Sequence, residues 1–426
     1  MSKQKVSNET IFVQIASYRD PELLPTIKDC LANAKYPENL RICIAWQHAE
    51  EDEWDNLDDY KNDPRFKIMD IHYKDAKGVC WARNRLQRHY NGEKYTLHLD
   101  SHHRFSKNWD ETLINMLKGL QNKGHKKPLL TAYLPGYFPN DDPKGRNNEV
   151  WFTNCDRYMP EGPIFIAPGH VPNWETLTEP IPARFYSGHF GFTLGEFTHD
   201  VPHDPELYFH GEETSISARA FTHGYDLFHP HIPVIWHEYT REGKKRHWDD
   251  HQFSPLDKAS FKKYRALFGI DNESREDMDF VGLDLGKERT LAEFERYIGV
   301  DFKGKRIQKH TSDQKMLPIP EMTEEEWESN FVNRFKYCID LYKPSVPDED
   351  YDCWVIAFKD KDDVEIARMD ADKAEIARIK QSNPTGHFYN IWREFDCLEH
   401  PKSWLLWPHS PSKEWDHEII KNEIPY

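Results

Sequence analysis

The chain has 426 residues, which is enough for two domains, and its 14 Trp, 20 Tyr and 24 Phe favour large packed cores over disorder. Its formal net charge of −17, with no long cluster of Lys and Arg, argues against a nucleic-acid binder, because DNA and RNA are bound through a basic face. Seven cysteines without framework spacing, a polar N-terminus and no apolar run approaching about 18 residues predict a cytoplasmic protein without a membrane span.

The first third of the chain alternates strand and helix patterns. Apolar, β-rich runs predict strands, in chain order, at residues 11–15, 41–46, 66–71, 95–99 and 129–133. Between them, apolar residues at helical spacing predict helices after Asp20-Pro21, over 79–90 and over 109–120. Strands that recur with helices between them indicate a doubly wound α/β layer around a mostly parallel sheet.

The rest of the chain is less regular. Residues 135–182 are rich in Pro, Gly, Asn and aromatic residues, which predicts long loops that shape a substrate site. Residues 255–300 read as helical and close the domain. After a linker-like segment over residues 311–326, strand-like runs follow at residues 352–359, 364–369, 388–395 and 404–407. We therefore expect an α/β domain over residues 8–310, a linker over 311–329 and a small β-rich domain over 330–426.

The most informative motif is the strand that ends in Asp100-Ser101-His102. Residues two apart on a strand point the same way, so Asp100 and His102 can share one divalent cation, which can in turn bind a diphosphate. Parallel sheets bind ligands at the carboxyl ends of their strands, and Ser17-Tyr18-Arg19 follows the first strand at that same edge. Taken alone the motif is weak, because Asp-Ser after a strand is also ordinary turn chemistry.

Two further segments open helices. Arg83 and Asn84 lie just after Gly78, where a helix N-terminus and Arg would attract phosphate, although an exposed helix face has the same pattern. Glu212 and Glu213 follow Gly211 and can accept hydrogen bonds from sugar hydroxyls or an acceptor. They can equally stabilise the positive end of their own helix.

Other residues complete the candidate site. His237 ends an apolar strand and is placed to join Asp100 and His102 in a metal site, although a lone histidine is more often a core residue. Gly188 and His189 belong to a segment of glycines and aromatics that fits either a wall for a sugar or acceptor, or a buried bend.

One competing hypothesis, a metal-dependent hydrolase, depends on histidines further along the chain. His247 and His251 are four residues apart and can share a helix face and a zinc ion, which with His237 would make a metal-dependent hydrolase. The Glu of the metalloprotease arrangement is missing, which weakens this reading. Lys244-Lys245-Arg246 beside them is read as a solvated turn rather than an anion contact.

Five ordered segments together resemble a known family. They are residues 15–22 (Ile-Ala-Ser-Tyr-Arg-Asp-Pro-Glu), 78–84, 98–105, 209–213 and 289–294. They resemble the GT-A-fold polypeptide N-acetylglucosaminyltransferases, cytoplasmic enzymes that place GlcNAc on hydroxyproline of a ubiquitin-ligase adaptor, and their microbial relatives. The resemblance covers roughly residues 10–300. It departs from the family pattern at His210 and in the β-rich tail, which leaves the acceptor open.

The resemblance implies a GT-A domain (a Rossmann-like α/β nucleotide-diphospho-sugar transferase fold), a UDP-GlcNAc donor, Mn²⁺ or Mg²⁺, and transfer with retention to a hydroxyl of a protein or glycan. It leaves open whether the tail binds the acceptor, forms a homodimer or caps the domain. The alternative is a non-catalytic carbohydrate-binding protein. The residue roles that it implies are uridine contacts from Ser17, Tyr18 and Arg19; diphosphate or sugar contacts from Arg83 and Asn84; metal ligation by Asp100, His102 and His237; and a catalytic place at the sugar and acceptor for Glu212 and Glu213. Gly188 and His189 are added from the residue pattern as sugar or acceptor contacts.

Overall fold

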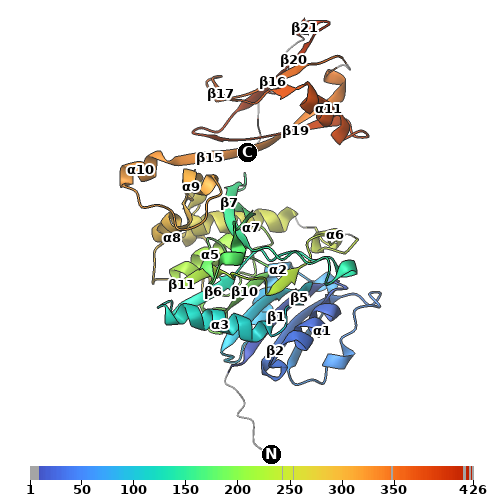
Figure 1. Cartoon of the computed structure of the whole chain (residues 1–426), viewed down its shortest axis with the longest axis vertical. Helices are drawn as coiled ribbons and strands as arrows, with labels where there is room; N and C mark the ends of the chain where they lie inside the picture. Colours follow the sequence, from blue (N-terminus) through green and yellow to red (C-terminus); the bar gives the residue numbers. More distant parts are fainter. Residues whose placement is uncertain are drawn as a thin grey trace, which may run out of the picture.

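The computed structural model describes residues 9–241, 243–252, 254–346, 349–415, 419–421 and 424. An eight-stranded sheet forms the centre of the N-terminal domain (Figure 1). Its order is β3 (Phe66–His72), β2 (Leu40–His48), β1 (Ile11–Tyr18), β4 (Tyr95–Asp100), β10 (Phe190–Leu194), β6 (Lys127–Thr131), β11 (Tyr225–His229) and β9 (Ile181–Pro182). The first four strands are parallel, and β10 runs antiparallel between β4 and β6. The predicted mostly parallel α/β sheet is therefore present.

Helices cover both faces of this sheet. One face packs against α1 (Leu23–Asn33) and α3 (Trp109–Asn122), whose buried residues join those of β1 and β4 in one core. The other face packs against α2 (Val79–Gln87), α4 (Phe197–Asp200) and α5 (Glu212–Thr222). β1 is buried on nearly all its residues because helices lie on both sides of it.

Glycines start two of these helices at places where no side chain fits. Gly78 precedes α2 with φ +109°, and a Cβ there would lie 2.8 Å from the ring of Tyr208. Gly211 precedes α5 with φ +93°, and a Cβ there would lie 2.6 Å from the ring of Tyr264. Both helix N-termini therefore come close to neighbouring backbone and rings in a way that only glycine permits.

The prediction of loops over residues 135–182 is wrong. The segment contains a hairpin of β7 (Trp151–Tyr158) and β8 (Ile164–His170), with a register shift between Cys155 and Arg157. Pro168 lies inside β8 and Gly162 in the turn, and these residues hid the strands from a pattern-based prediction. A two-stranded hairpin tolerates the proline because each strand needs a partner on one side only.

The end of the N-terminal domain is only partly helical. Its elements are β12 (Ile235–His237), which pairs with β5 (His103–Phe105) from earlier in the chain, α6 (His247–Asp250), α7 (Ser254–Phe268), α8 (Leu291–Ile298), β13 (Val300–Asp301) and β14 (Arg306–Gln308). Between α7 and α8 the chain makes short 3-10 turns, so the predicted helical block over residues 255–300 is interrupted. None of the described helices is both long enough and apolar enough to cross a membrane.

The C-terminal domain is a separate β-rich layer above the first domain in Figure 1. Its elements after α9 (Lys309–Ser312) and α10 (Glu324–Ser329) are β15 (Phe331–Tyr342), β16 (Cys353–Lys359), β17 (Glu365–Arg368), β18 (Ala371–Asp372), α11 (Lys373–Ser382), β19 (Phe388–Cys397), β20 (Ser403–Ser410), β21 (Glu414–Trp415) and β22 (Ile419–Lys421). Sequence patterns found β16, β17, β19 and β20 but missed the long β15 and helix α11. β14 pairs with β15, so one sheet runs from the first domain into the second.

Candidate active site

A cavity of about 630 Å³ opens at the carboxyl ends of β1 and β4. Ala16 and Tyr18 of β1, Asp100 of β4 and His237 of β12 line it, together with the hairpin residues Ile164 to Ile166. Open α/β sheets bind ligands at this edge, so the fold itself places the predicted motif in the cavity.

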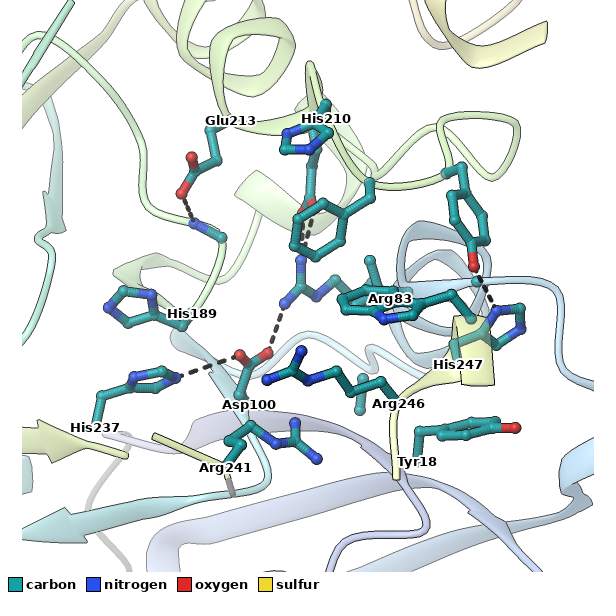
Figure 2. Close-up of a pocket in the computed structure, with 18 of the residues that line it drawn as sticks. Tyr18, Arg83, Asp100, His189, His210, Glu213, His237, Arg241, Arg246 and His247 are labelled. Atoms are coloured by element: carbon teal, nitrogen blue, oxygen red, sulfur yellow. Dashed lines mark hydrogen bonds and ion pairs between the residues drawn. The ribbon is translucent and has the colours of Figure 1, made fainter. Parts of the chain in front are cut away.

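Asp100, His102 and His237 come together in this cavity, and Figure 2 shows His237 pointing toward Asp100. One ligand atom from each lies within 4.8 Å of the others, and Asp100 Oδ2 is 3.8 Å from His102 Nε2 and 3.6 Å from His237 Nε2. Neither ring nitrogen of His237 has a hydrogen-bond partner among the described residues, although the ring is buried. Burial lowers the pKa of His237 to about 3, which leaves the ring neutral. One carboxylate and two imidazoles suit Mn²⁺ and related ions, so these residues fit a divalent cation.

Asp20 holds His102 in place from behind. Its Oδ2 lies 2.7 Å from His102 Nδ1 and accepts a hydrogen bond from Ser101 Oγ at 2.6 Å. Burial alone would raise the pKa of this carboxyl, but His102 and Arg241 outweigh burial and hold the pKa far below its usual value. An ionised Asp20 keeps the proton of His102 on Nδ1 and turns the Nε2 lone pair toward Asp100. The sequence motif contains Asp20, but the sequence-based assignment gave it no role.

Arg83 links Asp100 to the predicted carboxylate Glu212. Its guanidinium donates to both oxygens of Glu212, at 2.5 and 2.7 Å, and to Asp100 Oδ1 at 2.6 Å. His203 Nε2 lies 2.9 Å from the same carboxylate. Burial raises the pKa of Glu212, but Arg83 and His203 outweigh it and lower the pKa to about 2. Glu212 is therefore ionised, and its carboxylate is already hydrogen-bonded to Arg83, whose guanidinium it orients.

Glu213 has the opposite electrostatic environment. Its Oε1 accepts from the Gly188 backbone N–H and its Oε2 from the Tyr133 hydroxyl, both at 2.7 Å. Burial still dominates these hydrogen bonds and raises the pKa of Glu213 to about 7, with Glu212 adding to the rise. Of the two adjacent glutamates, Glu213 is the one that can hold or release a proton at neutral pH.

The predicted pair Gly188 and His189 lines the cavity. Gly188 connects to Glu213 through its N–H and to His98 through its carbonyl, 2.8 Å from His98 Nε2. The ring of His189 stacks on that of His237 with centroids 4.2 Å apart, and its Nε2 accepts from the Leu134 N–H. This segment therefore forms a wall next to the metal-site residues.

Basic side chains of the loop after β12 also line the cavity, where the sequence predicted only a solvated turn. Arg241, Lys245 and Arg246 are all lining residues. Figure 2 shows Arg241 and Arg246 extending toward the part of the cavity that holds Asp100. Lys244 instead pairs with Glu238. Lys245 and Arg246 are exposed, as a solvated turn predicts, and they also line the cavity, because charge runs in sequence do not tell which exposed side chains face a cavity. Their position directly after a cavity-lining strand was the available signal.

Three predicted nucleotide contacts lie outside the set of lining residues. Ser17 is fully buried. Arg19 has φ +45° and donates two 2.9 Å hydrogen bonds to Asp52. Asn84 donates to the carbonyl of His203 at 2.7 Å. Of the predicted uridine contacts, Tyr18 lines the cavity directly. The roles of Ser17, Arg19 and Asn84 stay predictions.

The histidines of the hydrolase reading do not converge on one ion. His247 Nδ1 lies 2.7 Å from the Tyr208 hydroxyl, and His251 Nε2 lies 3.0 Å from the Tyr73 carbonyl. Within the described part of the chain, the metal-competent group that contains His237 is completed by Asp100 and His102, not by these rings.

Comparison with known proteins gives a consistent result for the N-terminal domain. The family model described as Glycosyltransferase (GlcNAc) matches residues 10–65 and 58–304. No curated protein matches the chain significantly in sequence. The topology and this match confirm the expected fold class, a GT-A domain followed by a β-rich C-terminal part.

Solved structures with some similarity of backbone include three glycosyltransferases. GalNAc-T7 with UDP, GalNAc and Mn²⁺ has a TM-score of 0.42 and 17% identity over 60% of this chain and 56% of its own. S. aureus TarS 1-349 with UDP-GlcNAc has a TM-score of 0.37 and 13% identity over 60% and 65%. A mannosyltransferase from Pyrobaculum calidifontis with GDP-Man and Mn²⁺ has a TM-score of 0.33 and 13% identity over 63% and 72%. The match spans less than two thirds of the first two of these proteins.

Proposed function

The chain belongs to the GlcNAc glycosyltransferase family, and from this we propose that it transfers GlcNAc from UDP-GlcNAc to a hydroxyl of a protein or glycan, with a divalent cation and retention of configuration. The observation that carries the proposal is the convergence of Asp100, His102 and His237 in a cavity at the carboxyl edge of the sheet. We propose the cytoplasm as the location, supported by seven cysteines that are all unpaired.

In this proposal Asp100, His102 and His237 would hold Mn²⁺ or Mg²⁺, which when bound neutralises negative charge on the departing UDP. Arg241, Lys245 and Arg246 supply positive charge to the diphosphate from the same side of the cavity. Tyr18 contacts the uridine. Arg83, oriented by Glu212, donates hydrogen bonds to the sugar or diphosphate beside Asp100.

The transfer step involves one bond made and one bond broken at the anomeric carbon. The acceptor oxygen attacks from the face that the diphosphate leaves, the bond from carbon to the diphosphate oxygen breaks, and the proton of the acceptor hydroxyl goes to that departing oxygen. Glu213 and Gly188 orient the sugar and acceptor, and the hairpin residues Ile164 to Ile166 exclude water from the acceptor side.

The test is incubation with a panel of UDP-sugars with Mn²⁺ and with EDTA, followed by mass spectrometry of products formed from cell-lysate acceptors. We expect turnover of UDP-GlcNAc above the other donors, loss with EDTA, and loss in Asp100→Asn and His102→Ala. His170→Ala is the matched control, because His170 is an exposed histidine outside the lining residues. Full activity in both Asp100→Asn and His102→Ala would show that the assignment of the metal site is wrong. If calorimetry detects glycan binding but no UDP binding, the non-catalytic carbohydrate-binding alternative is favoured.

A further inference from the structure

Two long strands of the C-terminal domain carry an exposed aromatic face that the catalytic proposal does not use. β15 and β19 pair over ten residues, and side chains along each strand alternate between two faces. One face sends Ile339 and Ile391 into the core of the domain. The other carries Tyr342, Phe388 and Trp392, which are 51%, 43% and 59% exposed. Exposed aromatics gathered on one face indicate a binding surface.

Polar side chains separate these aromatics along the same face. Asp340 lies opposite Asn390 in the register, one step from the Tyr342–Phe388 pair on one side and from Trp392 on the other. Asn390 Nδ2 donates to Asp340 Oδ1 at 2.7 Å, and Asn390 Oδ1 accepts from Asn383 at 3.2 Å. We call Asp340, Tyr342, Phe388, Asn390 and Trp392 the outward strip. Its polar pair is held rigidly between two aromatic positions, and carboxylate and amide groups still face solvent.

The size of the outward strip argues against a second copy of the chain as its ligand. The strip extends two residues along the strands on either side of the Asp340–Asn390 pair, a length of about 13 Å. Two strands with their side chains are about 10 Å wide. The resulting area of about 130 Å² is far below the roughly 800 Å² that each partner buries in a standard protein interface. The strip is therefore matched to a small ligand or to one narrow chain.

The chemistry of the strip selects the ligand class. Aromatic ring faces pack against the C–H faces of sugar rings, and a carboxylate beside an amide hydrogen-bonds to hydroxyls. The ligand need not be anionic, and the net charge of −17 disfavours an anionic one. We infer that the outward strip binds a neutral carbohydrate chain, with sugars stacked on Trp392 and on the Tyr342–Phe388 pair and hydroxyls bound by Asp340 and Asn390.

The strip lies on the strand pair that continues the sheet from the catalytic domain into the C-terminal domain. On the same face of β15, Arg334 donates to the carbonyl of Ser312 in α9, at the junction between the domains. Figure 1 shows β15 and β19 as the part of the C-terminal domain nearest the catalytic domain. We take the bound carbohydrate to be part of a glycan acceptor, and in this the inference rests on the proposed function.

The experiment measures binding of glucose, mannose and N-acetylglucosamine oligosaccharides to the full chain by tryptophan fluorescence and by native gels that contain neutral polysaccharide. We expect at least one of them to bind the wild type, and Trp392→Ala and Tyr342→Ala to weaken that binding by at least tenfold. Trp415→Ala is the matched control, because Trp415 is 47% exposed in the same domain and lies outside the strip.

UDP-GlcNAc hydrolysis without acceptor is measured on the same variants and should stay unchanged in Trp392→Ala, so that failure of the strip and failure of the transferase proposal are distinguishable. The inference is overturned if no oligosaccharide binds the wild type, or if Trp392→Ala binds as tightly as Trp415→Ala. Sedimentation of a wild-type dimer that Trp392→Ala makes monomeric, without carbohydrate binding, would also overturn it in favour of self-association.

Discussion

At the scale of single residues, Asp20 lies behind His102, one of the proposed metal ligands. Asp20 is 1% exposed and contacts the ring nitrogen of His102 that points away from the cavity. Replacement by Asn keeps the shape but removes the charge that raises the basicity of the ring. Outer partners of this kind typically change metal affinity about 10–100-fold. We therefore expect Asp20→Asn to weaken Mn²⁺ binding by about that factor, measured by electron paramagnetic resonance of free Mn²⁺.

Asp110→Asn is the control for this variant. Asp110 is also buried, and its carboxylate accepts from the backbone N–H groups of Lys35 and Tyr36 rather than from a metal-site residue. The Asp110→Asn variant should lose about 1–3 kcal/mol of unfolding free energy while its affinity for Mn²⁺ stays unchanged. If the two variants bind Mn²⁺ equally well, Asp20 is only structural.

Glu213 predicts a pH dependence whose sign follows from burial. Its pKa of about 7 in the folded chain is above the value of 4.5 that is ordinary for a glutamate, so the folded state binds the extra proton between these two pH values. Stability should therefore fall as pH rises from about 4.5 to about 7 and stay level above that. Arg83, Glu212 and Tyr133 face this group, and their influence is already part of the shift.

Glu213→Gln removes the titrating group and should flatten this part of the stability curve, measured as free energy of unfolding in denaturant at several pH values. Glu149→Gln, which changes a carboxylate that is not buried, should keep the slope of the wild type. An unchanged slope in Glu213→Gln would show that the wild-type carboxyl titrates at an ordinary pKa.

At the scale of elements, sequence patterns predicted what is locally periodic and missed what depends on partners far along the chain. β1, β2 and β4 were found because each is a largely apolar run that is buried in a sheet covered on both faces. β3 is the edge strand with one buried residue, and it was found from its apolar residues alone. The β7–β8 hairpin was missed because Pro168 and the register shift after Cys155 break the alternation.

β15 was missed for a related reason. Its buried positions alternate with Lys336, Asp340 and other exposed or half-buried residues, so the run is not apolar overall. The same limit applies to the site. The motif residues of β4 and β12 could be expected at one sheet edge, but the direction of Arg241 and Arg246 depends on the fold of their loop.

At the scale of the whole molecule, two domains with separate cores are joined by one strand pair. The catalytic domain is built on cores around β1 and around α7 and α8, and the C-terminal domain on a core that includes Trp354. β14 pairs with β15 at only two positions, and Ser312 Oγ donates to Asp396 at 2.9 Å. These few polar contacts are weak beside the apolar burial within each core.

We therefore expect calorimetry to resolve two transitions, of which one responds to ligand. Mn²⁺ with UDP at about 100 times its dissociation constant stabilises the state that binds it by about 2.7 kcal/mol, and should raise only the catalytic-domain transition. EDTA or Asp100→Asn should abolish that rise.

Trp354→Ala leaves a cavity in the core of the C-terminal domain and costs about 3–5 kcal/mol of its unfolding free energy. It should therefore lower only the transition of the C-terminal domain. If there is a single transition, and both the Mn²⁺–UDP ligand and Trp354→Ala shift it, the β14–β15 pairing makes the two domains one cooperative unit. The outward strip would then be coupled to the catalytic cavity through that strand pair.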